Sequence, residues 1–242
     1  MIAPVEAPTH LRADRFLVWA ASLGEPRPPE RSGLKALAVR AVPPRLRPRL
    51  REAATRALRP LSRRRANRLA SRSPLNLHIG CGTLYKEGWV NIDLAGTRVD
   101  MPWNLAEPLP FPPRSVDAIF HEHLLEHLTY AQGIALHRRC LELLRPGGVL
   151  RIGVPDAGAA LQAYAMDQSG KASQWPTAMA RVASLTYDSG HQSIYDAETL
   201  ELSCMAAGFV RAGQREFGEG ELQPNADSPE RRGYTLYVEA TA

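Results

Sequence analysis

The sequence predicts an α/β fold with a mostly parallel, doubly wound sheet, preceded by a basic helical extension. Short apolar segments alternate with helical ones from residue 75 onward, which is typical of strands joined by crossover helices. A helical segment ending near Leu144 runs into Arg-Pro-Gly-Gly at 145–148, a strong stop signal, and then into an apolar strand. Residues 1–74 hold 17 of the 30 Lys and Arg but 5 of the 25 Asp and Glu, a net of +12 against −7 for the rest. We therefore expect a basic Pro/Arg-rich extension over 1–74 and one α/β domain over 75–242.

Each element of the domain has its own signal. Seven short apolar segments are predicted as strands: residues 75–79, 89–94, 97–103, 115–120, 149–155, 209–217 and 234–240. One helix is predicted from about residue 124 to 144. A second is predicted over 197–208, with Asp196 as its N-cap and Gly208 in the C-terminal capping position.

The composition narrows the class of protein. With 44% hydrophobic and 23% charged residues, the chain has the composition of an ordinary globular protein that can bury a core. No apolar run approaches the roughly 18–20 residues that span a bilayer, and the N-terminus lacks the pattern of a secretory signal. The three cysteines, Cys81, Cys140 and Cys204, are far apart and odd in number, which favours a reduced, cytoplasmic setting.

The extension is predicted to be helical in places. Helices are expected over residues 10–23 and 33–42, and another within 45–72, with Pro48 and Pro60 limiting its length. There Leu46, Leu50, Ala54 and Leu58 recur every four residues, so they share one helix face among arginines. Three interpretations stay open: an extension packed on the domain or disordered, a peripheral contact with the inner membrane surface through residues 45–72, and nucleic-acid binding. The last is weaker because no aromatic residues are interleaved with the arginines.

Candidate ligand groups follow successive strands. In such a sheet, ligands bind outside the carboxyl ends of the strands. Gly80 and Gly82 follow the first strand, where the lack of a Cβ lets backbone N–H groups approach a ligand closely. Asp93 ends the second strand, where a carboxylate can accept ribose hydroxyls, and Asn104 follows the third, where it could bond a base edge. Together these positions suit an adenosine.

The glycine spacing discriminates between adenosine cofactors. A dinucleotide site needs a third glycine where this chain has Tyr85, and Asp93 comes too early for the usual acid. No Gly-rich loop ending in Gly-Lys-Ser/Thr is present to hold a triphosphate. An adenosine cofactor without phosphates fits better, which points to S-adenosylmethionine (S-adenosyl-L-methionine).

Five motifs, taken in order along the chain, resemble class I S-adenosylmethionine-dependent methyltransferases, and most closely the methyltransferase type 11 group of predicted bacterial enzymes. These motifs are LHIGCG, GWVNIDL, LPFPPRSVDAIFHEHLLEHL, RRCLELLRPGGVLRIGVPD and HQSIYDAETLELSCMAAGF. The resemblance covers about residues 75–242. It implies a Rossmann-like sheet of seven strands with the last strand antiparallel.

The resemblance also implies roles for individual residues. Gly80, Cys81 and Gly82 would face the methionine portion of the cofactor, Asp93 the ribose, Asn104 and Leu105 the adenine, and His121 the sulfonium. Two departures stand out. Asn104 replaces the usual Asp, and the gap from Gly82 to Trp89 is too short for a crossover helix, so the first connection must be compact.

The HEHLLEH stretch at 121–127 offers candidates for a general base. His121 or His123, nearest the end of the fourth strand, could accept the acceptor's proton as neutral imidazole, and Glu122 is a lesser candidate. Glu126 and His127 are expected to fix the start of the following helix. Asp156, His191 and Tyr195 are candidates for the acceptor pocket. Cys81 is interpreted as small filler in the turn.

A metal site is an alternative to a general base as the interpretation of residues 121–127. His123-Leu-Leu-Glu126-His127 matches the H-x-x-E-H zinc pattern, and on a helix the two histidines share a face. Glu198 or Glu201 could supply a third ligand. Because this hypothesis leaves the glycines and Asp93 unexplained, we assign no metal ligand.

The sequence thus predicts a methyltransferase that acts on a hydroxyl or amine of a small molecule or glycan precursor. The glycan preference comes from the resemblance and from the suggested membrane-surface helix. The alternatives are an RNA or DNA methyltransferase that uses the basic extension, a zinc hydrolase with His123 and His127 as ligands, and a non-catalytic cofactor-binding module.

Overall fold

The computed structural model describes residue 43 and residues 46–166, 176–187 and 190–242. The helices expected over residues 10–23 and 33–42 lie outside the described residues. Within the described part, no helix is long and apolar enough to cross a membrane.

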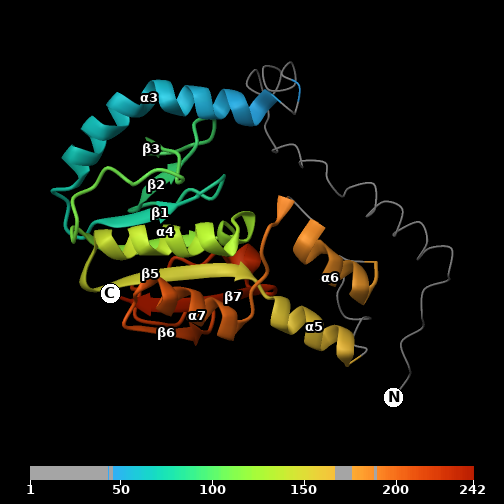
Figure 1. Ribbon diagram of the computed structural model, residues 1–242. Helices are drawn as coiled ribbons and strands as arrows, with labels where there is room; N and C mark the ends of the chain where they lie inside the picture. The colour runs from blue at the N-terminus through green and yellow to red at the C-terminus, as the bar shows by residue number, and fades with distance from the viewer. Residues whose placement is uncertain (1–42, 44–45, 167–175, 188–189) are drawn as a thin grey trace.

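The domain is built on one seven-stranded sheet, which confirms the expected fold class (Figure 1). The strands lie in the order β3-β2-β1-β4-β5-β7-β6. Strands β1 to β5 pair in parallel, whereas β7 is antiparallel to both β5 and β6. Their bounds are β1 Asn76–Ile79, β2 Val90–Asp93, β3 Met101–Pro102, β4 Val116–Glu122, β5 Leu144–Pro155, β6 Arg211–Arg215 and β7 Thr235–Thr241.

Two helices cover one face of the sheet. Helices α4 (Tyr130–Leu143) and α7 (Ala197–Ala207) lie in front of the strands in Figure 1. Their buried side chains, Leu136, Cys140 and Leu143 of α4 and Leu200 and Cys204 of α7, join the strand residues Ile119 and Ile152 in the main core cluster. Because the side chains of a strand alternate between faces, Ala118 and Phe120 point to the opposite side.

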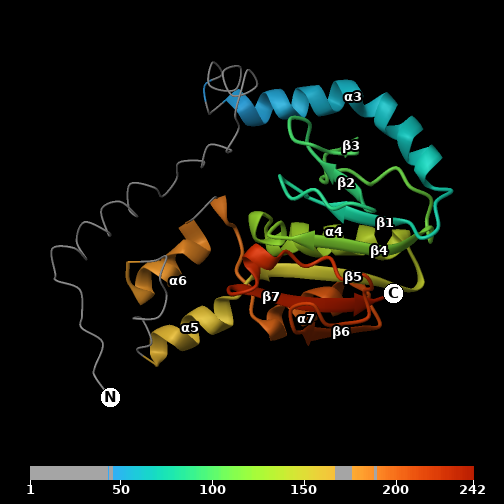
Figure 2. The same ribbon diagram turned by 180° about the vertical axis from the view of Figure 1, so that it is seen from behind.

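The opposite face is covered by the segment between β6 and β7 (Figure 2). Residues 216–234 cross this face, with one short 3₁₀ turn, η5 (Pro229–Arg231). Leu222 and Ala226 from this segment form a second apolar cluster with Trp89 and Phe120.

A buried ion network lies under the same segment. The fully buried Arg151 of β5 donates from Nε to Oδ1 of Asp227 at 2.9 Å and from Nη1 to Oε1 of Glu239 at 3.2 Å. It also donates from Nη2 to the carbonyl oxygen of Glu216 at 3.0 Å. Each buried charge is therefore paired and hydrogen-bonded, which is what allows it to lie in the interior.

Helix α4 begins later than the sequence indicates. The predicted start was near Leu124, but the helix runs from Tyr130, with Thr129 and Gln132 forming a capping box. Between β4 and α4, His123 has a positive φ of 53° and a 3₁₀ turn, η2 (Leu125–His127), follows. Leu128 and Thr129 have extended backbones, with ψ of 150° and 158°, so the helix cannot run through them and the helical start was wrong for residues 124–129.

The other predicted caps are confirmed. Asp196 accepts the backbone N–H of Thr199 at 2.9 Å at the start of α7, and Gly208 ends that helix with φ of 106°. Two further helices, α5 (Ala157–Ala165) and α6 (Ala178–Tyr187), lie beyond the carboxyl end of β5 (Figure 1).

The described part of the extension forms one long helix against the domain. Helix α3 (Arg47–Leu69) runs along the edge strand β3, and Pro60 lies inside it without ending it (Figure 1). Ser62 Oγ donates to the carbonyl oxygen of Pro102 at 2.8 Å, while Ala66 and Leu69 enter the main core. The packed face thus differs from the leucine face, which remains exposed at Leu46, Leu50 and Leu58.

Candidate active site

The turn after β1 presents bare backbone at the carboxyl edge of the sheet. Gly80 and Gly82 have positive φ values of 65° and 54°, a region that L side chains rarely adopt. A Cβ added to Gly80 would lie 2.8 Å from the Leu124 side chain, whereas a Cβ on Gly82 would meet no atom within 4 Å. Gly82 therefore borders open space that a ligand could fill.

Asp93 joins this turn to the end of β2. Its Oδ2 accepts the backbone N–H of Gly82 at 2.7 Å, and its Oδ1 accepts the N–H of Leu94 at 2.5 Å. Arg51 of α3 lies 3.4 Å from Oδ1, and the Asp93 side chain stays 19% exposed. Since a carboxylate offers about four acceptor positions, capacity remains for a ribose hydroxyl. The site therefore fits an adenosine.

The first connection is compact, as expected, and a buried side chain explains how. Asn91 Oδ1 accepts the N–H of Lys86 at 2.9 Å, while its Nδ2 donates to the carbonyl oxygens of Lys86 and Trp89. Tyr85, which stands where a dinucleotide site needs glycine, donates its hydroxyl to Asp100 Oδ1 at 2.9 Å.

The end of β3 lies against α3. Asn104 Oδ1 accepts the N–H of Ala106 at 2.9 Å, and the backbone oxygen of Leu105 accepts from Arg139 at 2.8 Å. Trp103 lies under the Arg59 guanidinium, 5.5 Å from the ring centroid. A small pocket between α3 and this strand end is lined in part by Thr55, Arg59, Trp103 and Asn104. The position of α3 at the site could not be predicted from the sequence, because the spacing of its arginines does not indicate a partner in β2 or β3.

His121 requires a correction. It is fully buried, and its Nε2 lies 3.2 Å from Nε2 of His137 on α4. Burial lowers the pKa of His121 well below its ordinary value. Because this side chain is enclosed between β4 and α4, it cannot contact a sulfonium or an acceptor, and the predicted roles of His121 in catalysis and cofactor contact are wrong.

His123 and Glu122, at the end of β4, bond to side chains of β7, which lies beyond β5 in the sheet. His123 Nε2 lies 2.8 Å from Thr235 Oγ1, and burial, followed by the charge of Arg231, lowers the pKa of His123 to about 3. Glu122 Oε1 accepts the Tyr237 hydroxyl at 2.6 Å and the N–H of Ser228 at 3.2 Å. His123 is therefore a weak base, and Glu122 is occupied with holding the segment between β6 and β7.

The fold does not bring the residues of the predicted zinc pattern together as ligands of one ion. His123 precedes the 3₁₀ turn, so His123 and His127 do not share an α-helical face. Glu201, a suggested third ligand, instead accepts the N–H of Gln214 at 2.8 Å. The described residues do bring Glu126, His127 and His191 together, with ligand atoms within 4.8 Å of one another.

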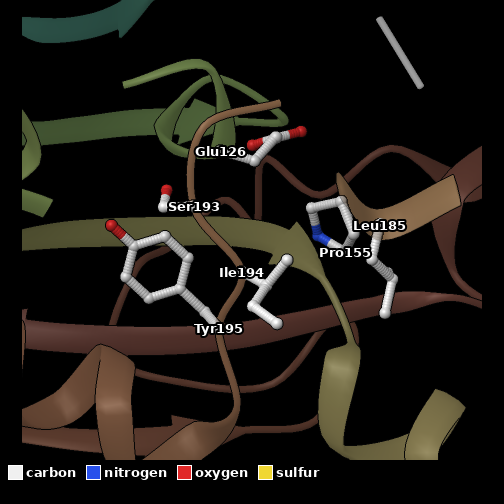
Figure 3. Close-up of a pocket in the computed structure, with 6 residues that line it drawn as sticks. All are labelled: Glu126, Pro155, Leu185, Ser193, Ile194 and Tyr195. Carbon is white, nitrogen blue, oxygen red and sulfur yellow. The ribbon is translucent and has the colours of Figure 1, made fainter. Parts of the chain in front are cut away.

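The remaining candidates fall near the carboxyl end of β5. Asp156 caps α5 by accepting the N–H of Ala159 at 2.8 Å. Tyr195, Pro155 and Glu126 line a small pocket there (Figure 3). Cys81 is buried, and desolvation raises its pKa to about 12, so this thiol is no nucleophile at neutral pH.

Comparison with known proteins agrees with this architecture. Residues 94–152 match the sequence model of the family described as a methyltransferase domain. This match starts one residue after Asp93 and covers β3, β4 and most of β5. No curated protein matches the chain in sequence.

Solved structures of similar proteins have low sequence identity. A methyltransferase from Archaeoglobus fulgidus is 17% identical over 79% of this chain and 94% of its own, with a TM-score of 0.47. One from Thermotoga maritima is 16% identical over 75% of this chain and 88% of its own, with a TM-score of 0.43. An O-methyltransferase family protein from Burkholderia thailandensis is 13% identical over 96% of this chain and 69% of its own, with a TM-score of 0.47.

The strand order of the sheet can be compared with the order expected for the matched family. In the observed order β7 lies between β5 and β6 and is antiparallel to both; the sequence resemblance implied that the last strand would be antiparallel. The matched segment, residues 94–152, and this sheet are consistent with the class I S-adenosylmethionine-dependent methyltransferases that the sequence resembles.

Proposed function

We propose that this methyltransferase transfers the methyl group of S-adenosylmethionine to a hydroxyl or amine of a small molecule or glycan precursor. The contact from Gly82 N–H to Asp93 Oδ2, at 2.7 Å, is the observation that carries the cofactor position. It joins the bare turn after β1 to the carboxylate after β2. We place the methionine portion at Gly80, Cys81 and Gly82, and the ribose at Asp93.

The adenine end of the cofactor follows from the same geometry. Asn104 and Leu105 come directly after β3, which is the neighbour of β2 in the sheet. The pocket between Asn104 and α3 supports an adenine site there, with Arg59 and Trp103 in its wall. Helix α3 would then form one side of the cofactor site, although its residues belong to the basic extension.

Methyl transfer requires alignment more than acid–base chemistry from the protein. The bound cofactor supplies an activated methyl group on a positively charged sulfur. The chain's residues orient the two reactants and exclude water. The acceptor is proposed to bind near Asp156, His191 and Tyr195, beyond the carboxyl end of β5, where α5 and α6 also lie (Figure 1).

A labelled-methyl assay tests the acceptor class. Full-length enzyme is incubated with S-adenosylmethionine carrying a labelled methyl group and with panels of sugars, nucleotide sugars, phenols and small amines. We expect label in at least one such compound and none in RNA or DNA. Label found in nucleic acid would instead support the alternative that uses the basic extension. No label in any small acceptor, with cofactor bound, would contradict the proposed class.

The outer face of α3 supports a peripheral contact with an anionic membrane surface. Leu50 and Leu61 are 53% and 58% exposed there, and Arg64 and Arg68, which follow Leu61 by three and seven residues and so share its helix face, are exposed as well. Apolar side chains flanked by arginines suit the interface of an anionic bilayer. The enzyme would then be cytoplasmic and peripheral at the inner membrane surface.

Cosedimentation with vesicles tests this contact. Vesicles with about a third anionic lipid should retain the wild type, and a variant with both Leu50→Ser and Leu61→Ser should bind at least several-fold less. Neutral vesicles are the control. Equal binding of both proteins would contradict the role of this face. RNA binding that falls steeply with added salt, without vesicle binding, would favour nucleic acid as the partner.

A further inference from the structure

An acid and two imidazoles from distant parts of the sequence meet beyond the carboxyl end of β4. Glu126 and His127 lie in η2, and His191 lies in the segment that leads into α7. The backbone N–H groups of Gln192 and Ser193 donate to the carbonyl oxygen of Glu126 at 2.7 and 3.2 Å. Gln192 Nε2 donates to the carbonyl oxygen of His127 at 2.6 Å. These bonds hold the two segments, and hence the three side chains, in a fixed relation.

The spacing of the three side chains suits one metal ion. Each offers a ligand atom, and these atoms lie within 4.8 Å of one another. Nitrogen and oxygen ligands stand about 2.0–2.2 Å from zinc, so two of them in a tetrahedral site are separated by about 3.4 Å. Side-chain movements of up to roughly an ångström, within the reach of rotations about the side-chain bonds, would close this set around an ion. The rings of His127 and His191 already meet edge to face, with centroids 5.0 Å apart.

The environment of the Glu126 carboxylate is independent evidence for a cation at this position. Glu126 is 1% exposed, and neither Oε1 nor Oε2 has a hydrogen-bond partner within the part of the chain that the structure describes. His123 Nδ1 lies 3.4 Å from Oε1 without forming a hydrogen bond with it. A buried carboxylate without donors is energetically costly. A cation between Glu126 and the two imidazoles would supply the missing partner.

The hydrogen bonding of His191 selects the tautomer that a metal needs. Its Nδ1 lies 2.9 Å from the carbonyl oxygen of Leu185 on α6. A carbonyl oxygen can only accept, so Nδ1 carries the proton and Nε2 keeps its lone pair. Metal-binding histidines commonly have such a backbone partner, which fixes the ring orientation.

We propose that Glu126, His127 and His191 form a binding site for one divalent transition-metal ion, with Zn²⁺ as the probe of choice. Two imidazoles and one carboxylate suit zinc and its first-row neighbours better than calcium or magnesium. This set differs from the sequence pattern, because His191 takes the place of His123.

The position of the site indicates what the ion could do. Three protein ligands leave a coordination position open, as in catalytic zinc sites. Glu126 also lines the pocket shared with Ser193 and Tyr195 (Figure 3). This use rests on the proposed function: a hydroxyl oxygen of the acceptor in the open position would lose its proton to solvent more readily. That oxygen then bonds to the methyl carbon as the carbon–sulfur bond breaks, releasing S-adenosylhomocysteine.

Calorimetric titration with ZnSO₄ tests the site without any acceptor. Full-length protein is treated with a chelator, dialysed, and titrated, and its metal content is measured by mass spectrometry. We expect one zinc per chain. His127→Ala and His191→Ala should each weaken zinc binding about 100-fold or more. Glu198→Gln, which removes an exposed acid on α7, is the matched control and should bind as the wild type does.

Two further measurements decide between the ligand sets and guard against misfolded variants. His123→Asn should leave zinc affinity within about threefold of the wild type; a loss equal to that of His191→Ala would overturn the assigned set. X-ray absorption of the wild type loaded with Co²⁺ should show two imidazoles and no sulfur ligand. Zinc bound equally by wild type and His191→Ala would also overturn the site.

Titration with the cofactor product distinguishes a failure of the metal site from a failure of the proposed function. No zinc bound, with normal affinity for S-adenosylhomocysteine, removes the metal site and leaves the methyltransferase assignment intact. Zinc bound at one per chain, with no affinity for S-adenosylhomocysteine, supports the site and contradicts the proposed cofactor position.

Discussion

The backbone N–H of Gly82 donates to Oδ2 of Asp93 at 2.7 Å, so the turn after β1 and the end of β2 are joined by one charge-assisted hydrogen bond. This bond orients the carboxylate, while the absence of a side chain at Gly82 keeps the neighbouring space open. The same small region therefore provides the carboxylate that would accept the ribose hydroxyls and the open space for the methionine portion attached to the ribose.

Gly82→Ala should weaken cofactor binding more than it weakens the fold. The residue has φ of 54°, so an alanine there costs about 1–2 kcal/mol of unfolding free energy, and its Cβ would occupy the space expected for the cofactor. We expect about tenfold weaker affinity for S-adenosylhomocysteine by calorimetry. Gly147→Ala is the control, because Gly147 also has positive φ and nothing within 4 Å of a Cβ. An equal loss of affinity in both variants would show that strain alone is responsible.

Asp227→Asn should strongly destabilise the domain. Arg151 is fully buried, and removing the charge of one carboxylate leaves its guanidinium incompletely compensated. We expect the free energy of unfolding in urea to fall by about 3–5 kcal/mol. Arg145→Met breaks the exposed pair with Asp117, in which Arg145 is 41% exposed, and should cost about 1 kcal/mol or less. A small loss for Asp227→Asn would mean that the network is solvated.

His121→Gln should affect stability rather than turnover. The variant disturbs the buried contact with His137 and should lower the free energy of unfolding by about 1–3 kcal/mol. Turnover per folded molecule should stay within about twofold, since His121 lies outside the proposed chemistry. A general base contributes about 10²–10⁴-fold, so a loss of that size in kcat with unchanged stability would restore the catalytic assignment.

The protein should lose stability as the pH falls below about 6.5. Burial lowers the pKa of His137 to about 4 and that of His78 to about 3, so both are neutral in the folded state while the unfolded chain binds protons. Their contribution is present above the unfolded pKa and is lost as the pH falls from about 6.5 toward these lower values. In urea titrations between pH 7 and 5, His137→Gln should reduce the slope by roughly 1 kcal/mol per pH unit. An unchanged slope would mean that His137 is already protonated in the folded protein.

Local signals in the sequence were enough to predict where the first strands end and which residues cap α7. Gly80, Gly82 and Asp93 follow strands that their own composition predicts, and Asp196 and Gly208 bond within their own helix. The class of sheet and the adenosine cofactor followed from these neighbouring positions, because parallel strands bring their carboxyl ends to one edge.

Contacts between distant segments could not be inferred in the same way. His121 looks like a strand-end base until His137, on the next helix, covers it. Likewise, His123 lies within hydrogen-bonding distance of Thr235 in β7, and His191 approaches Glu126 because the next residues, Gln192 and Ser193, bond to the backbone of η2. Periodicity shows which residues of a helix share a face, but not which face the rest of the protein will bury. For α3 the buried face holds Ser62, Ala66 and Leu69, whereas Leu46, Leu50 and Leu58 stay exposed.

Calorimetric titration of the wild type and Asp93→Ala with S-adenosylmethionine and S-adenosylhomocysteine tests the central claim most directly. The wild type should bind with micromolar affinity, and the variant about tenfold or more weakly, since a hydrogen bond to a charged group contributes about 1.5–3 kcal/mol. The same affinity in both proteins would contradict the placement of the ribose at Asp93.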